Sequence, residues 1–399
     1  MTNLHQFQPL YPESSVLGPL QELAAELVAE CHRLHGLAGD SITRALQPKL
    51  RAMNSYYTNK IEGQHTRPTD IERAIKNDFD ADAALAKKQR LAIAHMEAEE
   101  LLESRLDNPS LDALFNPALV CEIHKELYSR LPKKDQITDE GKIIIPGAYR
   151  KEDVEAGRHV APDWKSVDGF MKSWASYYEK LTGTEAFVIG IACSHHRLTW
   201  IHPFIDGNGR AARLHSHLLL HAKDLTQGLW SPMRGLARTQ EGYYTRLNNA
   251  DMPRRNDLDG RGALSQEELV NFIHYFLDIC LDQVKFMQKQ LDIASLKNRL
   301  KDLLVYLQSN PWQVGSEKSL IKLEALEALH YTAMAGPIER ARFIAMTGLG
   351  DRTGRRILAS LLDYGVLIAE STRAPISFTV PLSSLRFLFP NLWPEAETD

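Results

Sequence analysis

Hydrophobic residues recur at helical intervals through most of the chain. In residues 17–105 the apolar positions largely follow the three- and four-residue spacing of amphipathic helices, and one of these segments ends at Gly63. Further helical segments follow, and residues 268–308 read as one long amphipathic stretch. This pattern predicts a mostly α protein, with residues 1–105 as an N-terminal helical region and residues 106–309 as a core.

One segment in the first three quarters of the chain departs from the helical pattern. GKIIIPGAYRKEDVEAGRHVAP, residues 141–162, contains the β-rich run KIII, the turn-forming PGAYR and a closing VAP. Helical patterns stand on both sides of it. We therefore expect a helical bundle that carries one β-hairpin.

The last quarter of the chain has a different order of elements. NPWQVGS interrupts the helical pattern and predicts a linker over residues 310–317. Residues 318–385 then give helix, helix, turn, helix and two short alternating segments, which is the order of a winged helix-turn-helix. The sequence thus predicts a small C-terminal winged helix domain.

The charge of this C-terminal segment argues only weakly for DNA binding. Arg352, Arg355 and Arg356 fall on the expected recognition helix, where they could meet DNA phosphates. From Lys318 to Arg373, however, eight Lys and Arg face six Asp and Glu, a net charge of +2. Contact with another protein is the alternative use of this domain.

Composition restricts the class of protein without indicating its chemistry. The chain has 399 residues, 44% hydrophobic content and a net charge of -4, which are values of a soluble protein with more than one domain. The N-terminal residues lack a signal-peptide pattern, and no apolar run reaches the length that spans a bilayer. The four cysteines are scattered and form no CxxC pair, so we expect a cytoplasmic protein with reduced thiols.

The stretch IHPFIDGNGRAAR, residues 201–213, concentrates chemistry between two helical patterns. GNG followed by a helix can turn backbone N–H groups toward an anion, as in phosphate sites. Arg210 and Arg213 are three residues apart and can clamp a polyphosphate. Asp206 offers oxygen ligands to Mg²⁺, and His202 is a general base. The chain lacks a P-loop and an HExxH zinc motif.

HPFIDGNGRAAR resembles the Fic motif, HxFx(D/E)GNGRxxR, at every specified position. The resemblance implies a Fic-domain protein adenylyltransferase, which moves AMP from ATP to a Tyr, Ser or Thr hydroxyl of a target protein and releases pyrophosphate. It implies His202 as the catalytic base and Asp206 as the Mg²⁺ ligand. It also implies an ATP-binding set made of His202, Gly207, Asn208, Gly209, Arg210 and Arg213.

Two further segments resemble parts of the same family. The hairpin resembles the flap that pairs with the target backbone, and its flap residues are Gly147, Ala148, Tyr149 and Arg150. EGYYTRLNNAD resembles the region beside the adenine pocket, where Tyr243 and Tyr244 cover the nucleoside. Core packing is the competing interpretation of these two tyrosines. Asp251 stands where relatives can carry an amide.

TNKIEG, residues 58–63, places a glutamate at a predicted helix end, although the C-terminal end of a helix disfavours a carboxylate. Thr58, Glu62 and Gly63 fit the family's inhibitory pattern [S/T]xxxE[G/N], and they precede the Fic motif as in the N-terminal inhibitory class. The resemblance implies that Glu62 pairs with Arg213 and misplaces the γ-phosphate of ATP. Thr58 lies on the same helical face and is expected to hydrogen-bond across the helix contact.

Other interpretations keep the fold and change the function. Members of the family also remove AMP or transfer other phosphate-containing groups, and a DNA-binding regulator with a Fic core as its sensor is a further alternative. Self-modification and a homodimer are compatible with the sequence. The pair His217 and His221 lies on one helical face without a third ligand at metal-site spacing, which favours ordinary histidines over zinc.

Overall fold

The computed structural model describes residues 3–106, 109–315 and 319–397. These residues form two compact units, and each unit is discontinuous in sequence. The first contains residues up to 32, residues 54–66 and residues 73–284, and the second contains residues 33–53, 67–72 and those from 285 onward. None of the described helices is both long and apolar enough to cross a membrane.

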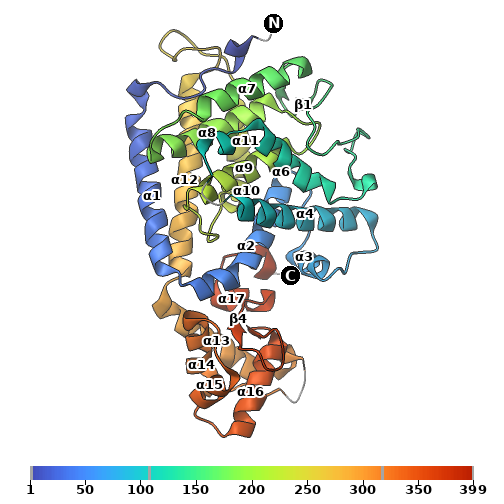
Figure 1. Cartoon of the computed structure of the whole chain (residues 1–399), viewed down its shortest axis with the longest axis vertical. Helices are drawn as coiled ribbons and strands as arrows, with labels where there is room; N and C mark the ends of the chain where they lie inside the picture. The colour runs from blue at the N-terminus through green and yellow to red at the C-terminus, as the bar shows by residue number, and fades with distance from the viewer. Residues whose placement is uncertain (1–2, 107–108, 316–318, 398–399) are drawn as a thin grey trace. The chain divides into compact units, whose positions relative to one another are not determined.

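The first unit is built on helices α8 (Thr184–Ile201) and α9 (Asn208–Ala222), which pack against each other. Helix α8 is buried without a break from Phe187 to Leu198, so all of its faces are covered, which places it in the core. Around this pair lie α4 (Ala83–Arg105), α6 (Pro117–Ser129) and α7 (Val167–Tyr178), as Figure 1 shows. The loop that joins α8 to α9 therefore begins and ends at buried helices.

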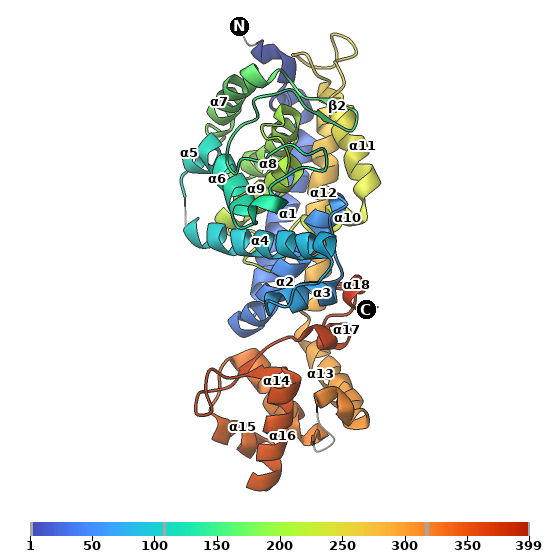
Figure 2. The same ribbon diagram turned by 90° about the vertical axis from the view of Figure 1, so that its right-hand side faces the viewer.

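The remaining elements of the first unit complete the helical shell. Figure 2 shows α12 (Gln266–Gln290) beside α11 (Gln240–Ala250) in the turned view. The helices are α1 (Gly18–Leu37), α2 (Asp40–Ile61), α5 (Leu111–Leu114), α10 (Met233–Arg238), α11 (Gln240–Ala250) and α12 (Gln266–Gln290), and the 3₁₀ turns are Leu4–Phe7, Ser14–Val16, Lys133–Asp135 and Trp164–Ser166. Helices α1, α2 and α12 each continue beyond this unit.

The predicted β-hairpin exists within residues 141–162, but its strands lie later than expected. Strands β1 (Glu155–Ala156) and β2 (His159–Val160) pair antiparallel across a turn at Gly157 and Arg158. The β-rich KIII run makes one isolated bridge, between Ile137 and Ile143. PGAYR is not the hairpin turn, because its backbone is used in contacts with the core that are described below.

The long amphipathic stretch predicted over residues 268–308 is two helices. Helix α12 ends at Gln290, and α13 (Ile293–Ser309) begins after Asp292. The Asp292 side chain accepts a hydrogen bond from the backbone N–H of Ser295, which is the contact of an N-cap. The hydrophobic pattern continues across this break, which explains why the pattern alone missed it.

The second unit contains the C-terminal elements. Its helices are α3 (Pro68–Ile75, which continues into the first unit), α13, α14 (Leu326–Ala335), α15 (Arg340–Met346), α16 (Asp351–Tyr364), α17 (Leu385–Leu388) and α18 (Pro394–Glu397), with 3₁₀ turns at Pro311–Val314, Leu323–Ala325 and Leu382–Ser384. Strands β3 (Leu367–Ile368) and β4 (Ser377–Phe378) pair antiparallel. Part of the predicted 310–317 linker and the start of the 318–385 domain, residues 316–318, lie outside the described residues.

The arginines of the predicted recognition helix lie on α16. Arg352, Arg355 and Arg356 are exposed, and Arg355 forms an ion pair with Asp351 one turn earlier, at 3.0 Å. An exposed pair of this kind contributes little to stability and leaves the face solvated. The winged helix and its contact with DNA stay predictions.

Candidate active site

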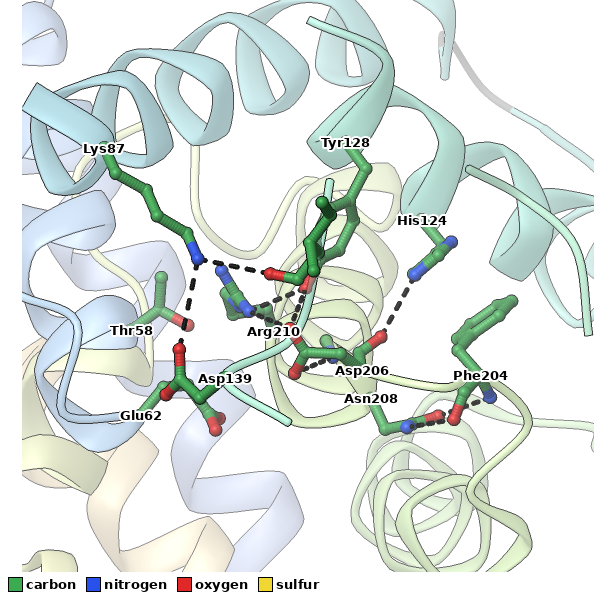
Figure 3. A network of polar contacts seen from close by, with 12 residues as sticks. Thr58, Glu62, Lys87, His124, Tyr128, Asp139, Phe204, Asp206, Asn208 and Arg210 are labelled. Carbon is green, nitrogen blue, oxygen red and sulfur yellow. Dashed lines mark hydrogen bonds and ion pairs between the residues drawn. The ribbon is translucent and has the colours of Figure 1, made fainter. Parts of the chain in front are cut away.

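The loop between α8 and α9 is fixed by its own backbone and side chains. His202 ends α8 in a left-handed conformation, with φ of 51°. Asn208 accepts a hydrogen bond from the N–H of Phe204 (2.8 Å) and donates one to the Phe204 carbonyl (2.9 Å), a reciprocal pair drawn in Figure 3. Gly207 has φ of 80° and lies so close to Tyr128 that any side chain would collide with it. The GNG sequence is therefore required by this geometry.

The hydrogen-bond geometry of His202 leaves its Nε2 available to accept a proton. Its Nδ1 lies 3.1 Å from the carbonyl oxygen of Thr199, and a carbonyl can only accept, so Nδ1 carries the hydrogen. In the neutral ring, Nε2 then has a free lone pair. Burial lowers the pKa of His202 to about 4, with a smaller contribution from His159, so the ring is neutral near pH 7.

Asp206 and Arg210 form a network with two side chains of α6 (Figure 3). The Tyr128 hydroxyl donates to Asp206 Oδ2 at 2.9 Å, and Arg210 donates to the same oxygen at 3.2 Å. His124 donates from Nε2 to the backbone carbonyl of Asp206 at 3.1 Å. Burial raises the pKa of Asp206, but Arg210 and the Tyr128 hydrogen bond outweigh burial and hold it below its usual value. Asp206 is thus an ionised carboxylate, and its side chain is 40% exposed.

Arg213 makes its contacts with the end of α2. Its Nε donates to Thr58 Oγ1 at 2.8 Å, and its Nη2 donates to the Thr58 carbonyl at 3.2 Å. The same Nη2 forms an ion pair with Glu62 Oε1. Arg213 and Thr58 are fully buried, whereas the Glu62 side chain is 28% exposed. Gly209 leaves the space that the Glu62 carboxylate occupies.

The end of α2 is held by its sequence and by α11. Gly63 has φ of 69°, its N–H bonds the Lys60 carbonyl, and the N–H of Gln64 bonds the Asn59 carbonyl at 2.8 Å. This is the Schellman motif that glycine favours at a helix end. Gln240 (3.0 Å) and the Tyr244 hydroxyl (2.8 Å) also donate to the backbone carbonyl of Ile61. The position of Glu62 is therefore fixed by the helix cap that follows it and by the α11 hydrogen bonds to Ile61, the residue before it.

A cavity of about 510 Å³ lies between His202 and Arg213. Such a volume suits a nucleoside-sized ligand. Its walls come from the hairpin turn, the end of α8, α9 and α11, and they include Glu62, His159, Trp200, Gly209, Tyr243, Tyr244, Leu247, Asn248 and Asp251. Tyr243 is also tied to the core, because its hydroxyl lies 2.7 Å from His195 Nε2. The two interpretations of Tyr243, core residue and cavity wall, describe different parts of one side chain.

A second cavity of about 810 Å³ also has Glu62 in its lining. It is lined by Tyr128, Asp206 and Arg210, together with residues of the 135–163 segment. Lys87 points toward this region and contacts the Ile137 carbonyl and Asp139, as Figure 3 shows. Glu62 borders both cavities.

Asp251, in the wall of the nucleoside-sized cavity, binds the hairpin through His159. Asp251 Oδ2 lies 2.8 Å from His159 Nδ1, and Oδ1 lies 3.2 Å from His196 Nε2. His159 Nε2 also donates to the Trp200 carbonyl at 2.8 Å, so both ring nitrogens face acceptors and carry hydrogens. Burial lowers the pKa of His159, but Asp251 outweighs burial and raises it. The sequence did not predict this contact.

Two of the predicted flap residues support the loop between α8 and α9. The N–H of Gly147 donates to His124 Nδ1 at 2.9 Å, and the N–H of Arg150 donates to the Pro203 carbonyl at 2.9 Å. The Arg150 guanidinium is buried and donates to the His202 carbonyl at 2.8 Å. Gly147 and Arg150 thus support the His202 loop, and a flap role for Gly147, Ala148, Tyr149 and Arg150 stays a prediction.

The structure brings together most of the residues that the motifs singled out. His202, Gly209, Arg213, Tyr243 and Tyr244 share one cavity with Glu62. The sequence reasoning missed His124, Tyr128, Gln240 and the pairing of Asp251 with His159. Nothing in their local pattern marks them, since each of these contacts joins residues at least 78 positions apart in the chain.

The chain can be compared with known proteins by its sequence and its fold. The Fic/DOC family pattern matches residues 114–220. Protein adenylyltransferase Fic of Nematostella vectensis is 27% identical over 200 residues, covering 49% of this chain and 42% of that protein. A Fido domain-containing protein of Dictyostelium discoideum is 36% identical over 84 residues, covering 20% of this chain and 57% of that protein.

Two solved structures share the fold. A Fic family protein from Desulfovibrio desulfuricans has a TM-score of 0.51 at 19% identity, covering 94% of this chain and 99% of that one. Fic-1 of C. elegans (residues 134–508) has a TM-score of 0.51 at 17% identity, covering 68% of this chain and 73% of that one. Residues 114–220 therefore resemble a Fic domain, and the two solved structures show that the fold is shared. Its matches to the two curated relatives span less than two thirds of their lengths.

Proposed function

We propose that this protein transfers AMP from ATP to a Tyr, Ser or Thr hydroxyl of a target protein, and that Glu62 restrains the reaction. The observation that carries the proposal is the shared cavity. The lone pair of His202 Nε2, the start of α9 and Arg213 border one space of nucleoside size, and Glu62 borders the same space. The name of the Nematostella relative, protein adenylyltransferase, supports the same chemistry.

In the proposed reaction His202 Nε2 takes the proton of the acceptor hydroxyl. The hydroxyl oxygen forms a bond to the α-phosphorus of ATP, and the bond from that phosphorus to the bridging oxygen breaks, so pyrophosphate leaves. The backbone N–H groups at the start of α9 face the phosphates, where the helix dipole favours negative charge. Arg210 and Arg213 bind the β- and γ-phosphates once Arg213 is released from Glu62.

The donor set fits one Mg²⁺ ion at Asp206. Its carboxylate is ionised and partly exposed, and it lines the larger cavity at the start of α9. Mg²⁺ prefers carboxylate oxygen and water, and it binds few protein ligands when phosphates supply the rest. When bound, the ion neutralises phosphate charge.

The restraint by Glu62 acts on a buried cation. Arg213 is fully buried and is already bound by Thr58 and Glu62, so a γ-phosphate can reach it only by displacing the Glu62 carboxylate. Removal of one partner of a buried ion pair leaves the other uncompensated, which favours a new anion at that place. ATP supplies that anion in the active form.

The test uses ATP labelled at the α-phosphate, with Mg²⁺ and cell lysate. The Glu62→Gly protein is expected to label lysate proteins or itself, and the Glu62→Gly/His202→Ala protein is not. Glu140→Gln is the matched control, because Glu140 lines the larger cavity without contacting Arg213. ATP labelled at the γ-phosphate should transfer nothing. A Glu62→Gly protein that labels neither itself nor lysate contradicts the proposal.

Removal of AMP is the second candidate reaction, because the partly exposed Glu62 carboxylate stands at the cavity and could orient a water molecule. Proteins labelled in the first experiment serve as its substrate. Release of AMP by the wild-type protein, and loss of that release in Glu62→Gly, supports it. Retention of all label over hours contradicts it.

DNA binding by the C-terminal unit is a separate proposal, supported by the exposed Arg352 and Arg355 on α16. A gel shift with genomic fragments at low salt tests it, with the Arg352→Ala/Arg355→Ala protein as the control. Absence of a shift with the wild-type chain contradicts it. A homodimer stays a prediction, which sedimentation of the full chain can check.

A further inference from the structure

A buried group of imidazole and carboxylate side chains lies on facing sides of α4 and α9, outside the proposed AMP-transfer site. Helix α4 carries His95, Glu99 and Glu103, each four residues after the last, so they share one face. Helix α9 carries His217 and His221 with the same spacing. His95, Glu99 and His217 are each 1% exposed and Glu103 is 9% exposed.

The polar atoms of this group converge. His217 Nε2 lies 2.8 Å from Glu103 Oε1 and 3.8 Å from Glu99 Oε1. His221 Nδ1 lies 3.8 Å from Glu103 Oε1. One polar atom from each of Glu99, Glu103 and His217 lies within 4.8 Å of the other two. Ligand atoms around a tetrahedral Zn²⁺ are about 3.4 Å apart, given bonds of about 2.1 Å, so the group needs little rearrangement to bind such an ion.

His95 supplies an independent observation. Among the described residues, neither of its ring nitrogens has a hydrogen-bond partner. Its Nδ1 points to Glu99 Oε2 at 3.6 Å, beyond hydrogen-bond distance. A fully buried imidazole without a hydrogen bond is costly, and such groups call for a ligand that the protein atoms do not supply.

The two carboxylates of the group favour a bound cation. Two carboxylates, Glu99 and Glu103, approach each other in a buried place, and Asn54 donates a hydrogen bond to Glu99 at 2.8 Å. Buried carboxylates need positive charge close by. A single divalent cation neutralises both and uses the imidazole of His217 as a nitrogen ligand.

We propose that this group is a structural site for one divalent transition-metal ion of the zinc class. Glu99, Glu103 and His217 are its ligands, and His221 completes a four-ligand set of two imidazoles and two carboxylates. His95 lies beside Glu99 outside this set, and a shift of a few tenths of an ångström on metal binding would let its Nδ1 donate to Glu99, as partners of metal ligands commonly do. The oxygen and imidazole donors suit zinc, and four protein ligands leave no position for substrate.

The consequence is a fixed contact between α4 and α9. His217 follows Arg213 by one turn on α9, so the ion would hold the helix that carries both phosphate-binding arginines. Sequence spacing pointed away from a metal site, because His217 and His221 have no third ligand in their own segment. The other ligands come from α4, more than 100 residues earlier.

Equilibrium dialysis of the full chain with Zn²⁺ alone, after chelation and removal of any affinity tag, tests the proposal. Elemental analysis should give about one zinc per wild-type chain. Glu103→Gln and His217→Ala should each lower the retained zinc at least tenfold, with helical circular dichroism retained. His274→Ala, at an exposed pair with Asp278, is the matched control and should keep its zinc.

Thermal melting gives a second measurement that does not depend on activity. Zn²⁺ should raise the melting temperature of the chelated wild-type protein by several degrees, since a ligand that binds only the folded state stabilises it. Glu99→Gln, which preserves shape, should abolish that rise. Folded wild-type protein that retains less than about a tenth of an equivalent of zinc overturns the proposal. Zinc that persists undiminished in both Glu103→Gln and His217→Ala also overturns it.

Discussion

Arg210 and Arg213 are one turn apart on the same helix, both are buried, and each is paired with a carboxylate, but the two carboxylates differ in origin. Asp206 belongs to the loop that leads into α9, four residues before Arg210. Glu62 comes from α2, 151 residues before Arg213. The first pair is part of the loop, whereas the second depends on the contact between two separate helices. A local pair suits a permanent site, and a distant pair suits a restraint that can be withdrawn.

The largest effect is expected at the local carboxylate. In the Glu62→Gly background, Asp206→Asn should lower AMP transfer by on the order of 100-fold or more, because it removes the only negative oxygen proposed to hold Mg²⁺. Transfer of α-phosphate label at saturating Mg²⁺ measures it. Equal rates in the Glu62→Gly protein and in the Glu62→Gly/Asp206→Asn protein would contradict the proposed role of the local carboxylate.

Substitution of the distant carboxylate, Glu62, should raise the rate of AMP transfer, whereas substitution of Asp206 should lower it. A charge-assisted hydrogen bond contributes about 1.5–3 kcal/mol, so Glu62→Gln should raise AMP transfer by about 10- to 150-fold through release of Arg213. The initial rate of labelling measures it, and Glu140→Gln again serves as the control. A lower rate in Glu62→Gln than in the wild-type protein would show that Glu62 assists the reaction.

The ion pair of Asp251 with His159 on the hairpin is a further contact between distant segments. Asp251→Asn should raise the KM for ATP and speed tryptic cleavage after the exposed Arg158, since the hairpin loses its ion pair with His159. The matched control is Glu155→Gln, on the same hairpin. The expected kcat is unchanged, so a loss of kcat with unchanged KM and cleavage would argue against a positioning role.

The stabilisation by this pair has a defined pH range. The raised pKa of His159 means that its contribution is complete below the ordinary value of 6.5 and is lost as pH rises through the folded-state pKa. The lowered pKa of Asp251 means that its contribution is present above the ordinary value of 3.8 and is lost as pH falls through the folded-state pKa. Tryptic cleavage after Arg158 should therefore be slowest between these two values.

Thr58 tests whether the restraint depends on more than one contact. Thr58→Val removes the acceptor of Arg213 Nε, and a buried donor left without its partner costs about 1–3 kcal/mol. We expect a lower free energy of unfolding and a partial rise in AMP transfer, smaller than that of Glu62→Gln. Urea unfolding and the labelling rate measure the two effects. Thr43→Val, at another threonine of α2, is the control.

The smallest effect is expected from pH near neutrality. His202 must be unprotonated to accept the hydroxyl proton, and its pKa is lowered to about 4, so AMP transfer should change little between pH 8 and pH 6. Glu62 raises this pKa, so the Glu62→Gly protein should keep its activity to still lower pH. A midpoint near 6.5 in the rate profile would indicate an exposed histidine and contradict the geometry.

The fold and the central loop could be predicted because their signals are local. Helical periodicity fixed the mostly α class, and HPFIDGNGRAAR carries base, anion site and arginines in one uninterrupted segment. Gly63 and Glu62 were also readable, since a helix end has its own pattern. The ion pair with Arg213 was expected from family resemblance, and no property of either segment alone required it.

The missed features depend on contacts between distant segments. The hairpin was placed too early because KIII has high β-propensity, whereas Arg150 and Gly147 bind PGAYR to the core. The break at Asp292 was missed because the apolar stripe continues across it. Glu99 and Glu103 gave no metal signal in sequence, since their partners His217 and His221 lie on another helix. Packing decides these features.

One measurement tests the central claim most directly, that Glu62 restrains the protein by occupying Arg213. Mass spectrometry would count AMP-modified peptides after incubation of lysate with ATP and each of three proteins: wild type, Glu62→Gly and Glu62→Gly/Arg213→Ala. The account predicts few modified peptides with wild type, many with Glu62→Gly and few again with the double variant. Equal modification by Glu62→Gly and by the double variant would contradict it, because the release of Arg213 would then have no consequence.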